Sequence, residues 1–268
     1  MATKAQFKLR GEQYDFEKDA AAVLYKGGKL DTALDKLKGS HISDFGKQLL
    51  AADETEFKRL LNITTEIFWD ECSNRWTTSN GAFISTAQKK FGEKSLCCTA
   101  DKSAYSSDCI EFGGDPFTIN FWVRTDSSIA SGAWVFRAIG TKRSFALKMK
   151  DTTTLQLYYG TTSASTEVTA TGYYRSLSRA TWHHVEIDYK SGTVYFFVDG
   201  NNLYGGVARS TSLTVAREPR RITFGPAACY IDEFRLRDGT CQHTSNFTVP
   251  SAAYNKTADT IALLHFED

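Results

Sequence analysis

The stretch FTINFWVR, from Phe117 to Arg124, decides the fold class, because its side chains alternate in character along an extended backbone. Four apolar side chains fall on one face of it: Phe117, Ile119, Phe121 and Val123. A period of two residues is typical of a β-strand with one face against a core, whereas a helix needs a period of 3.6. The stretch therefore predicts a strand.

Similar short runs follow along the chain as far as its end. They cover residues 134–139, 144–150, 155–159, 183–189, 194–198, 222–224, 230–236 and 261–266. Most are bounded by Gly, Asp, Asn, Ser or Thr, which is typical of strands joined by hairpins. Because no long helical pattern separates them, antiparallel pairing and a sandwich or barrel are expected.

Three glycine-containing positions indicate where the backbone reverses. Ser191-Gly192 and Asp199-Gly200 each follow an apolar run and predict hairpin turns, and Gly92 predicts a tight turn. Such turns need positive φ, which glycine adopts without steric cost.

The first 62 residues have a different pattern, with apolar side chains at helical spacing. One stripe begins at Phe16, a second at Leu30 and a third at Phe57, the last after a capping box formed by Asp53 and Glu56. Helices this short are marginal in water unless they pack on something. We therefore expect an N-terminal helical anchor or oligomerisation region at 1–62 and a sandwich at 63–268.

Composition and charge exclude several classes of partner. The net charge is +1 and 24% of the 268 residues are charged, so no overall field draws the chain to nucleic acid or to an anionic membrane. No stretch approaches the roughly 18 apolar residues of a membrane-spanning helix. The first 19 residues have no apolar core, so we expect no secretion signal and production in the cytoplasm.

Six cysteines offer no strong disulfide or zinc pattern, since no C-x-x-C spacing occurs: Cys72, Cys97, Cys98, Cys109, Cys229 and Cys241. We expect reduced thiols that are mostly buried, with disulfides as the alternative.

Several motifs together resemble the laminin-G-like domains of the concanavalin A-like lectin/glucanase superfamily. The motifs are ISTAQKKFGEKSLCC (Ile84 to Cys98), DPFTINFWVR (Asp115 to Arg124), TWHHVEIDYKSGTVYFFVDG (Thr181 to Gly200) and YIDEFRLRDG (Tyr230 to Gly239). The resemblance implies an all-β, antiparallel two-sheet sandwich of the jelly-roll kind, carrying a small N-terminal α-helical region.

Two further stretches resemble elements of phage virion proteins. The segment His41 to Ile63 is similar to a short helical element of phage tail fibres, although any helix-turn-helix linker would read alike, and FTVPSAAY (Phe247 to Tyr254) is phage-like. This resemblance implies a structural protein of a virion, either a capsid decoration (head fibre) or a tail-fibre component. Its N-terminal helices would contact other virion proteins. We expect a homo-oligomer, with a trimer favoured.

The superfamily also contains glycosidases, so catalysis has to be considered. Laminarinase-like members use a strand with E-x-D-x-x-E, and Glu186 and Asp188 match its first two carboxylates, but Ser191 stands at the third position. A retaining glycosidase needs two carboxylates about 5 Å apart as nucleophile and acid. No G-x-S-x-G elbow and no phosphate-binding loop occur. We therefore expect no enzyme, with a degenerate glycoside hydrolase as the least favoured alternative.

Two kinds of binding site remain as candidates. Asp232 is similar to a calcium ligand of laminarinase-like relatives and would hold one structural calcium ion, unless it caps a turn or pairs with Arg235 or Arg237. Aromatic side chains beside polar loops are candidates for glycan contacts: Trp76, Trp134, Tyr158, Tyr159, Tyr173 and Tyr174. The loop 160–171 is a candidate for specificity. A lectin that recognises cell-surface glycans is thus the alternative to a purely structural virion protein.

Overall fold

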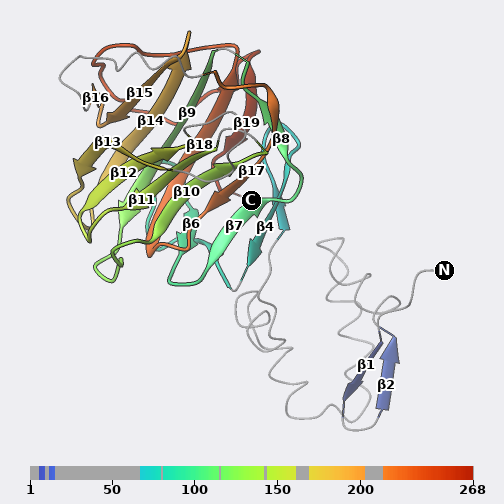
Figure 1. The fold of residues 1–268 in the computed structure, drawn as a ribbon. Helices are drawn as coiled ribbons and strands as arrows, with labels where there is room; N and C mark the ends of the chain where they lie inside the picture. The colour runs from blue at the N-terminus through green and yellow to red at the C-terminus, as the bar shows by residue number, and fades with distance from the viewer. Residues whose placement is uncertain are drawn as a thin grey trace. The chain divides into compact units, whose positions relative to one another are not determined.

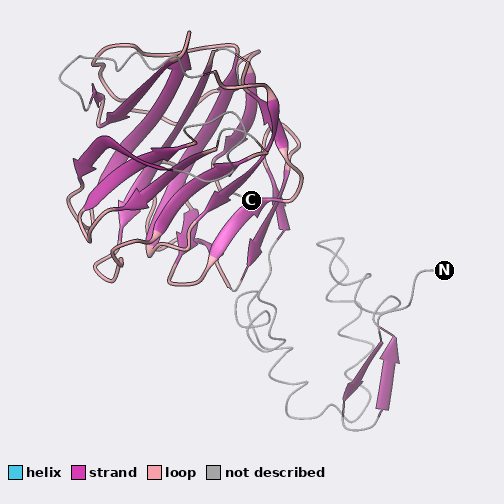
Figure 2. Ribbon diagram, viewed as in Figure 1, coloured by secondary structure: helices cyan, strands magenta, loops and turns pink. Residues whose placement is uncertain are grey.

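The computed structural model describes residues 6–9, 12–15, 67–79, 81–114, 116–141, 144–160, 169–202 and 214–267. The chain divides into two compact units, Met1–Ile63 and Thr64–Asp268. No helix occurs among the described residues, and none therefore qualifies as a membrane-spanning helix (Figure 2).

In the first unit the described residues form one antiparallel hairpin of β1 (Gln6–Leu9) and β2 (Glu12–Asp15). The expectation of helices in the first 62 residues was too broad here, because these two segments are strands. The predicted helices between residues 16 and 62 lie outside the described residues. A boundary between a helical anchor and the sandwich stays a prediction.

The second unit is an antiparallel two-sheet sandwich, which confirms the predicted fold class (Figure 1). One sheet, called here the outer-row sheet, has the order β13-β12-β11-β10-β17-β7-β4-β3, with β8 paired to β17. Its strands are β3 (Ile67–Trp69), β4 (Arg75–Ser79), β7 (Ser103–Ser106), β8 (Ile110–Phe112), β10 (Trp134–Ile139), β11 (Phe145–Met149), β12 (Thr154–Tyr159), β13 (Thr169–Ser176) and β17 (Glu218–Phe224).

The other sheet, called the covered sheet, has the order β16-β15-β14-β9-β18-β6-β5, with β19 paired to β18. Its strands are β5 (Phe83–Ser85), β6 (Ser95–Cys98), β9 (Phe117–Thr125), β14 (Trp182–Lys190), β15 (Thr193–Val198), β16 (Asn201–Asn202), β18 (Cys229–Asp238) and β19 (Thr260–Leu264). The nine strands predicted from the sequence are all present.

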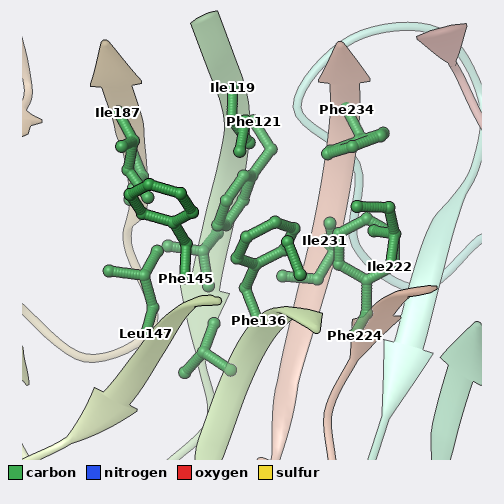
Figure 3. Close-up of a cluster of buried hydrophobic side chains, with 14 of the residues drawn as sticks. Ile119, Phe121, Phe136, Phe145, Leu147, Ile187, Ile222, Phe224, Ile231 and Phe234 are labelled. Carbon is green, nitrogen blue, oxygen red and sulfur yellow. The ribbon is translucent and has the colours of Figure 1, made fainter. Parts of the chain in front are cut away.

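The core lies between the two sheets and is rich in phenylalanine. Phe121 of β9 contacts Phe136 of β10 at 5.5 Å between ring centroids, and Phe224 of β17 contacts Phe234 of β18 at 5.0 Å. Figure 3 shows these side chains pointing toward one another from strands of both sheets. Aromatic pairs at such distances add to the free energy of burying their apolar area.

Strand β9 is buried on both faces. Phe117, Ile119, Phe121 and Val123 enter the core as predicted, but the opposite face is buried too, with Asn120 0% and Trp122 3% exposed. The covering segment, defined here as residues 240–254, makes hydrogen bonds with side chains on that face. One broad side of the sandwich is therefore occupied by the chain itself.

The predicted turns are confirmed. Ser191 and Gly192 have φ of 48° and 81°, and Asp199 and Gly200 have 51° and 72°. A Cβ at Gly200 would lie 2.0 Å from the Phe247 carbonyl oxygen, so only glycine lets the covering segment pass this close.

Candidate functional site

A row of side chains crosses four strands on the outer face of the outer-row sheet. Trp134 on β10 is paired with Lys148 on β11, Lys148 with Gln156 on β12, and Gln156 with Tyr174 on β13. Directly paired residues in antiparallel strands share a face of the sheet. Tyr158 lies two residues along β12 from Gln156 and so projects from the same face.

The aromatic rings of this row contact lysine side chains. Trp134 meets Tyr158 edge to face with 5.5 Å between ring centroids, and the Lys148 Nζ lies 4.8 Å from the Trp134 centroid. At the end of the row the Lys150 Nζ lies 4.5 Å from the centroid of Tyr174, whose side chain is 51% exposed. We call Trp134, Lys148, Lys150, Tyr158 and Tyr174 the aromatic-lysine row.

Such a surface has the chemistry of a saccharide platform. Ring faces accept the C–H groups of a sugar, and ammonium groups donate hydrogen bonds to hydroxyl or carboxylate oxygens. Aromatic residues with a few polar groups are a usual arrangement for ligand binding.

Two of the predicted glycan contacts are wrong because their side chains are buried. Trp76 is 0% exposed, lies 5.7 Å from Phe224 between ring centroids, and donates its indole N–H to Asp70 Oδ2 at 3.3 Å. Tyr173 is 3% exposed and belongs to the core. Neighbouring residues on a strand project to opposite faces, so Tyr173 points inward where Tyr174 points outward.

Tyr159 occupies an intermediate position. It is partly buried and packs against the hydrophobic core, on the face of β12 opposite to Tyr158. Its ring therefore lies on the core side of the sheet and does not belong to the exposed surface of the aromatic-lysine row. The candidate loop 160–171 is described only at Gly160 and at its last residues, which begin β13.

Asp232 on β18 has its oxygens occupied by backbone N–H groups. Oδ2 accepts hydrogen bonds from the N–H of Lys90 at 2.7 Å and of Phe91 at 3.2 Å, and Oδ1 accepts one from Glu233 at 2.8 Å. Burial raises the pKa of Asp232 to about 7, although these N–H groups oppose the shift. Calcium needs six to eight oxygen ligands, and these donors do not fit such a shell. The carboxylate caps the loop at residues 90–91.

Glu186 and Asp188 share the covered face of β14 and are both 0% exposed. His243 of the covering segment bonds Glu186 Oε1 through Nδ1 at 2.5 Å, and the Gln242 N–H bonds Asp188 Oδ1 at 2.7 Å. Burial raises the pKa of both carboxyl groups, and the neighbouring Glu186 raises that of Asp188 further. Ser191, at the third position of the glycosidase pattern, lies in the hairpin turn. A sugar cannot reach these carboxylates while the covering segment is in place.

The sequence did not indicate which polar residues accompany the aromatic-lysine row or the carboxylates Glu186 and Asp188. Lys148, Lys150 and Gln156 join the aromatic side chains only through strand register, and His243 reaches Glu186 across 57 residues. Two open hollows of about 310 and 400 Å³ border Tyr254 and do not coincide with the aromatic-lysine row.

Comparison with known proteins places this geometry in a family. No curated protein matches the chain. Among solved structures, domain 4 of an extracellular arabinanase of Geobacillus stearothermophilus, in complex with arabinotriose, is 15% identical with a TM-score of 0.47, over 66% of this chain and 84% of that one. The carbohydrate-binding module CBM66 of Bacillus subtilis is 12% identical with a TM-score of 0.40, over 60% and 94%.

The binding domain of botulinum neurotoxin serotype D is also similar, at 8% identity and a TM-score of 0.45, over 69% of this chain and 48% of that one. The family model of the concanavalin A-like lectin/glucanases superfamily matches residues 99–244, more than half of the chain. With its two antiparallel sheets, the chain therefore belongs to the concanavalin A-like lectin/glucanases superfamily.

Proposed function

We propose that this protein is a non-catalytic attachment protein of a phage virion, and that its sandwich binds cell-surface carbohydrate through the aromatic-lysine row. The observation that carries the binding proposal is the placement of Trp134, Tyr158 and Tyr174 on one outer face, with two lysine ammonium groups against their rings. Stacking on aromatic rings gives affinity, and the lysines favour sugars with carboxylate or other acidic groups.

The burial of Glu186 and Asp188 supports the absence of hydrolysis. A general acid and a nucleophile must both touch the glycosidic bond, whereas here both carboxylates are 0% exposed beneath the covering segment. A degenerate hydrolase would release reducing sugar slowly and lose that activity in Glu186→Gln. We expect no release above buffer from either protein.

The virion context is supported by sequence alone. Residues His41 to Ile63 and Phe247 to Tyr254 resemble phage elements, and short amphipathic segments before residue 63 need a partner surface. In the proposal these segments fix the protein to the head or tail as a homo-trimer, and the sandwich projects outward.

Glycan binding is tested with the purified full-length protein on an array of bacterial and mammalian polysaccharides, followed by calorimetry with the best ligand. Trp134→Ala and Tyr174→Ala should each weaken binding by about five- to tenfold, since stacking contacts of this size are worth about 1–1.5 kcal/mol. Trp69→Ala is the matched control, because Trp69 is 58% exposed but lies on β3, at the far edge of the same sheet. Equal losses in all three variants, or no saturable ligand, would refute the proposed surface.

The virion role is tested separately on assembled particles. A density map of a purified particle should place the sandwich on the head or the tail surface, and solution mass should give a trimer for the full-length chain. A full-length protein that stays monomeric at high concentration and is absent from particles would contradict the role, whatever the glycan array shows.

A further inference from the structure

Three potential metal ligands converge beneath the covering segment. Glu186 and Asp188 come from β14 and His243 from the covering segment, and one ligand atom of each lies within 4.8 Å of the others. Both carboxylates are 0% exposed, whereas the His243 side chain is 26% exposed. The carboxylates are thus buried, whereas the imidazole is in part exposed.

One acceptor atom beside these ligands lacks a donor, and the two carboxyl groups contact each other. Asn120 Oδ1 has no hydrogen-bond partner among the described residues, and the residue is 0% exposed. The carboxyl groups of Glu186 and Asp188 lie within hydrogen-bonding distance of each other. The Asn120 amide lies against the group, since its Nδ2 donates to Glu186 Oε2 at 3.0 Å. A buried acceptor without a donor is costly, and two adjacent carboxylates need a proton or a cation between them.

The ligands are held in place by neighbouring contacts. The His243 ring stacks on Phe247 at 3.6 Å between centroids and 7° between planes. Asp188 Oδ1 is fixed by the Gln242 N–H at 2.7 Å and by the Thr118 hydroxyl. Such support keeps the entropy lost on metal binding small.

We propose that Glu186, Asp188 and His243 form a site for one divalent transition-metal ion of the zinc type. An imidazole with two carboxylates suits Zn²⁺ or its first-row neighbours, whereas Ca²⁺ prefers an all-oxygen shell. The two negative charges balance the ion in a buried setting, and a water would complete four ligands. The nearby guanidinium of Arg237 is paired with Asp259 Oδ2 at 2.8 Å, which limits its competition for the carboxylates.

The test uses the full-length protein after dialysis against a chelator. Calorimetry with Zn²⁺ alone should give one ion per chain, and the melting temperature should rise with Zn²⁺ and not with Ca²⁺. His243→Gln and the isosteric Asp188→Asn should each weaken Zn²⁺ binding by roughly 100-fold or more, because even supporting residues cost 10–100-fold.

His265→Gln is the matched control. His265 also bonds a buried glutamate through Nδ1, Glu233 at 2.7 Å, and its side chain is 21% exposed, yet it lies outside the group. This variant should keep wild-type Zn²⁺ affinity.

The free cysteines require a second readout, because Cys109 is exposed and thiols bind zinc. Co²⁺ should give visible d–d absorption without a near-ultraviolet thiolate band. A thiolate band, unchanged Zn²⁺ affinity in His243→Gln, or no binding by a folded wild-type protein would each overturn the inference. None of these outcomes bears on glycan binding, so the two proposals fail separately.

Discussion

The imidazole Nε2 of His184 and the phenol oxygen of Tyr254 lie 2.6 Å apart, although the two residues are separated by 70 positions in the chain. His184 projects from β14 and is 0% exposed, and its other ring nitrogen has no hydrogen-bond partner among the described residues. Tyr254 is 6% exposed and lies at the end of the covering segment. This hydrogen bond joins the covering segment to the middle of the covered sheet.

Tyr254→Phe should therefore destabilise the sandwich. The change removes the phenol oxygen and leaves His184 without a hydrogen bond on either ring nitrogen, which costs about 1–3 kcal/mol in the free energy of unfolding. Urea unfolding followed by tryptophan fluorescence measures the loss. The control is Tyr174→Phe, which removes an exposed hydroxyl and should stay within about 0.5 kcal/mol of wild type. Equal effects would mean that the buried bond contributes nothing.

The stability contributed by His265 should depend on pH. Its bond to Glu233 raises the pKa of His265 above the ordinary value, and the negative charge of Glu71 adds to this, although burial lowers it. A histidine with a raised folded pKa stabilises the fold fully below its unfolded pKa of about 6.5 and loses that effect as pH rises through the folded value.

His265→Gln should accordingly lower the melting temperature more at pH 6 than at pH 8.5. Scanning calorimetry of both proteins at the two pH values measures the difference. A larger loss at pH 8.5 would show that the imidazole acts through packing and not through its charge.

Asp232→Ala should unfold more easily than Asp232→Asn. Alanine leaves the N–H groups of Lys90, Phe91 and Glu233 without their acceptor, for a loss of about 3 kcal/mol, whereas asparagine keeps one acceptor oxygen. Chemical unfolding in chelator and again in millimolar Ca²⁺ checks both the capping role and the ion. Stabilisation by Ca²⁺ that Asp232→Asn abolishes would restore the calcium prediction.

Substitutions of Trp76 and Trp134 should distinguish a loss of folding stability from a loss of glycan binding. Trp76→Ala empties a fully buried site and should cost about 3–5 kcal/mol, whereas Trp134→Ala removes a partly exposed ring and should cost about 1 kcal/mol. Only the second should weaken glycan binding in protein that remains folded. Wild-type glycan affinity in Trp134→Ala would exclude this ring from the site.

The fold could be predicted from the sequence because strand periodicity and turn residues are local signals. The alternation from Phe117 to Val123 and the Ser191-Gly192 turn each depend on neighbours in the chain, and both are confirmed. Among the strands that were missed, β5 and β8 are three residues long, too short for a period of two to show. The longer β13 was also missed, because its sequence TATGYYRS does not alternate between apolar and polar side chains.

The candidate sites were harder to predict because burial depends on distant segments. Trp76 and Trp134 both lie close to a Ser- or Thr-containing stretch of the sequence, and only sheet packing distinguishes a core ring from a surface ring. Likewise, Glu186 and Asp188 alternate with apolar residues as solvent-facing side chains do. The covering segment buries both side chains, and the sequence of β14 does not indicate that another segment covers it.

The covering segment also determines where the chain can be shortened. The family match ends at residue 244, before Tyr254 and before β19, which pairs with β18 at Phe234 to Arg237. A fragment cut there would uncover an unpaired strand edge and lose the bond to His184, and exposed edges promote aggregation. Expression of the isolated sandwich therefore requires the sequence as far as Phe266, which itself packs on Phe224.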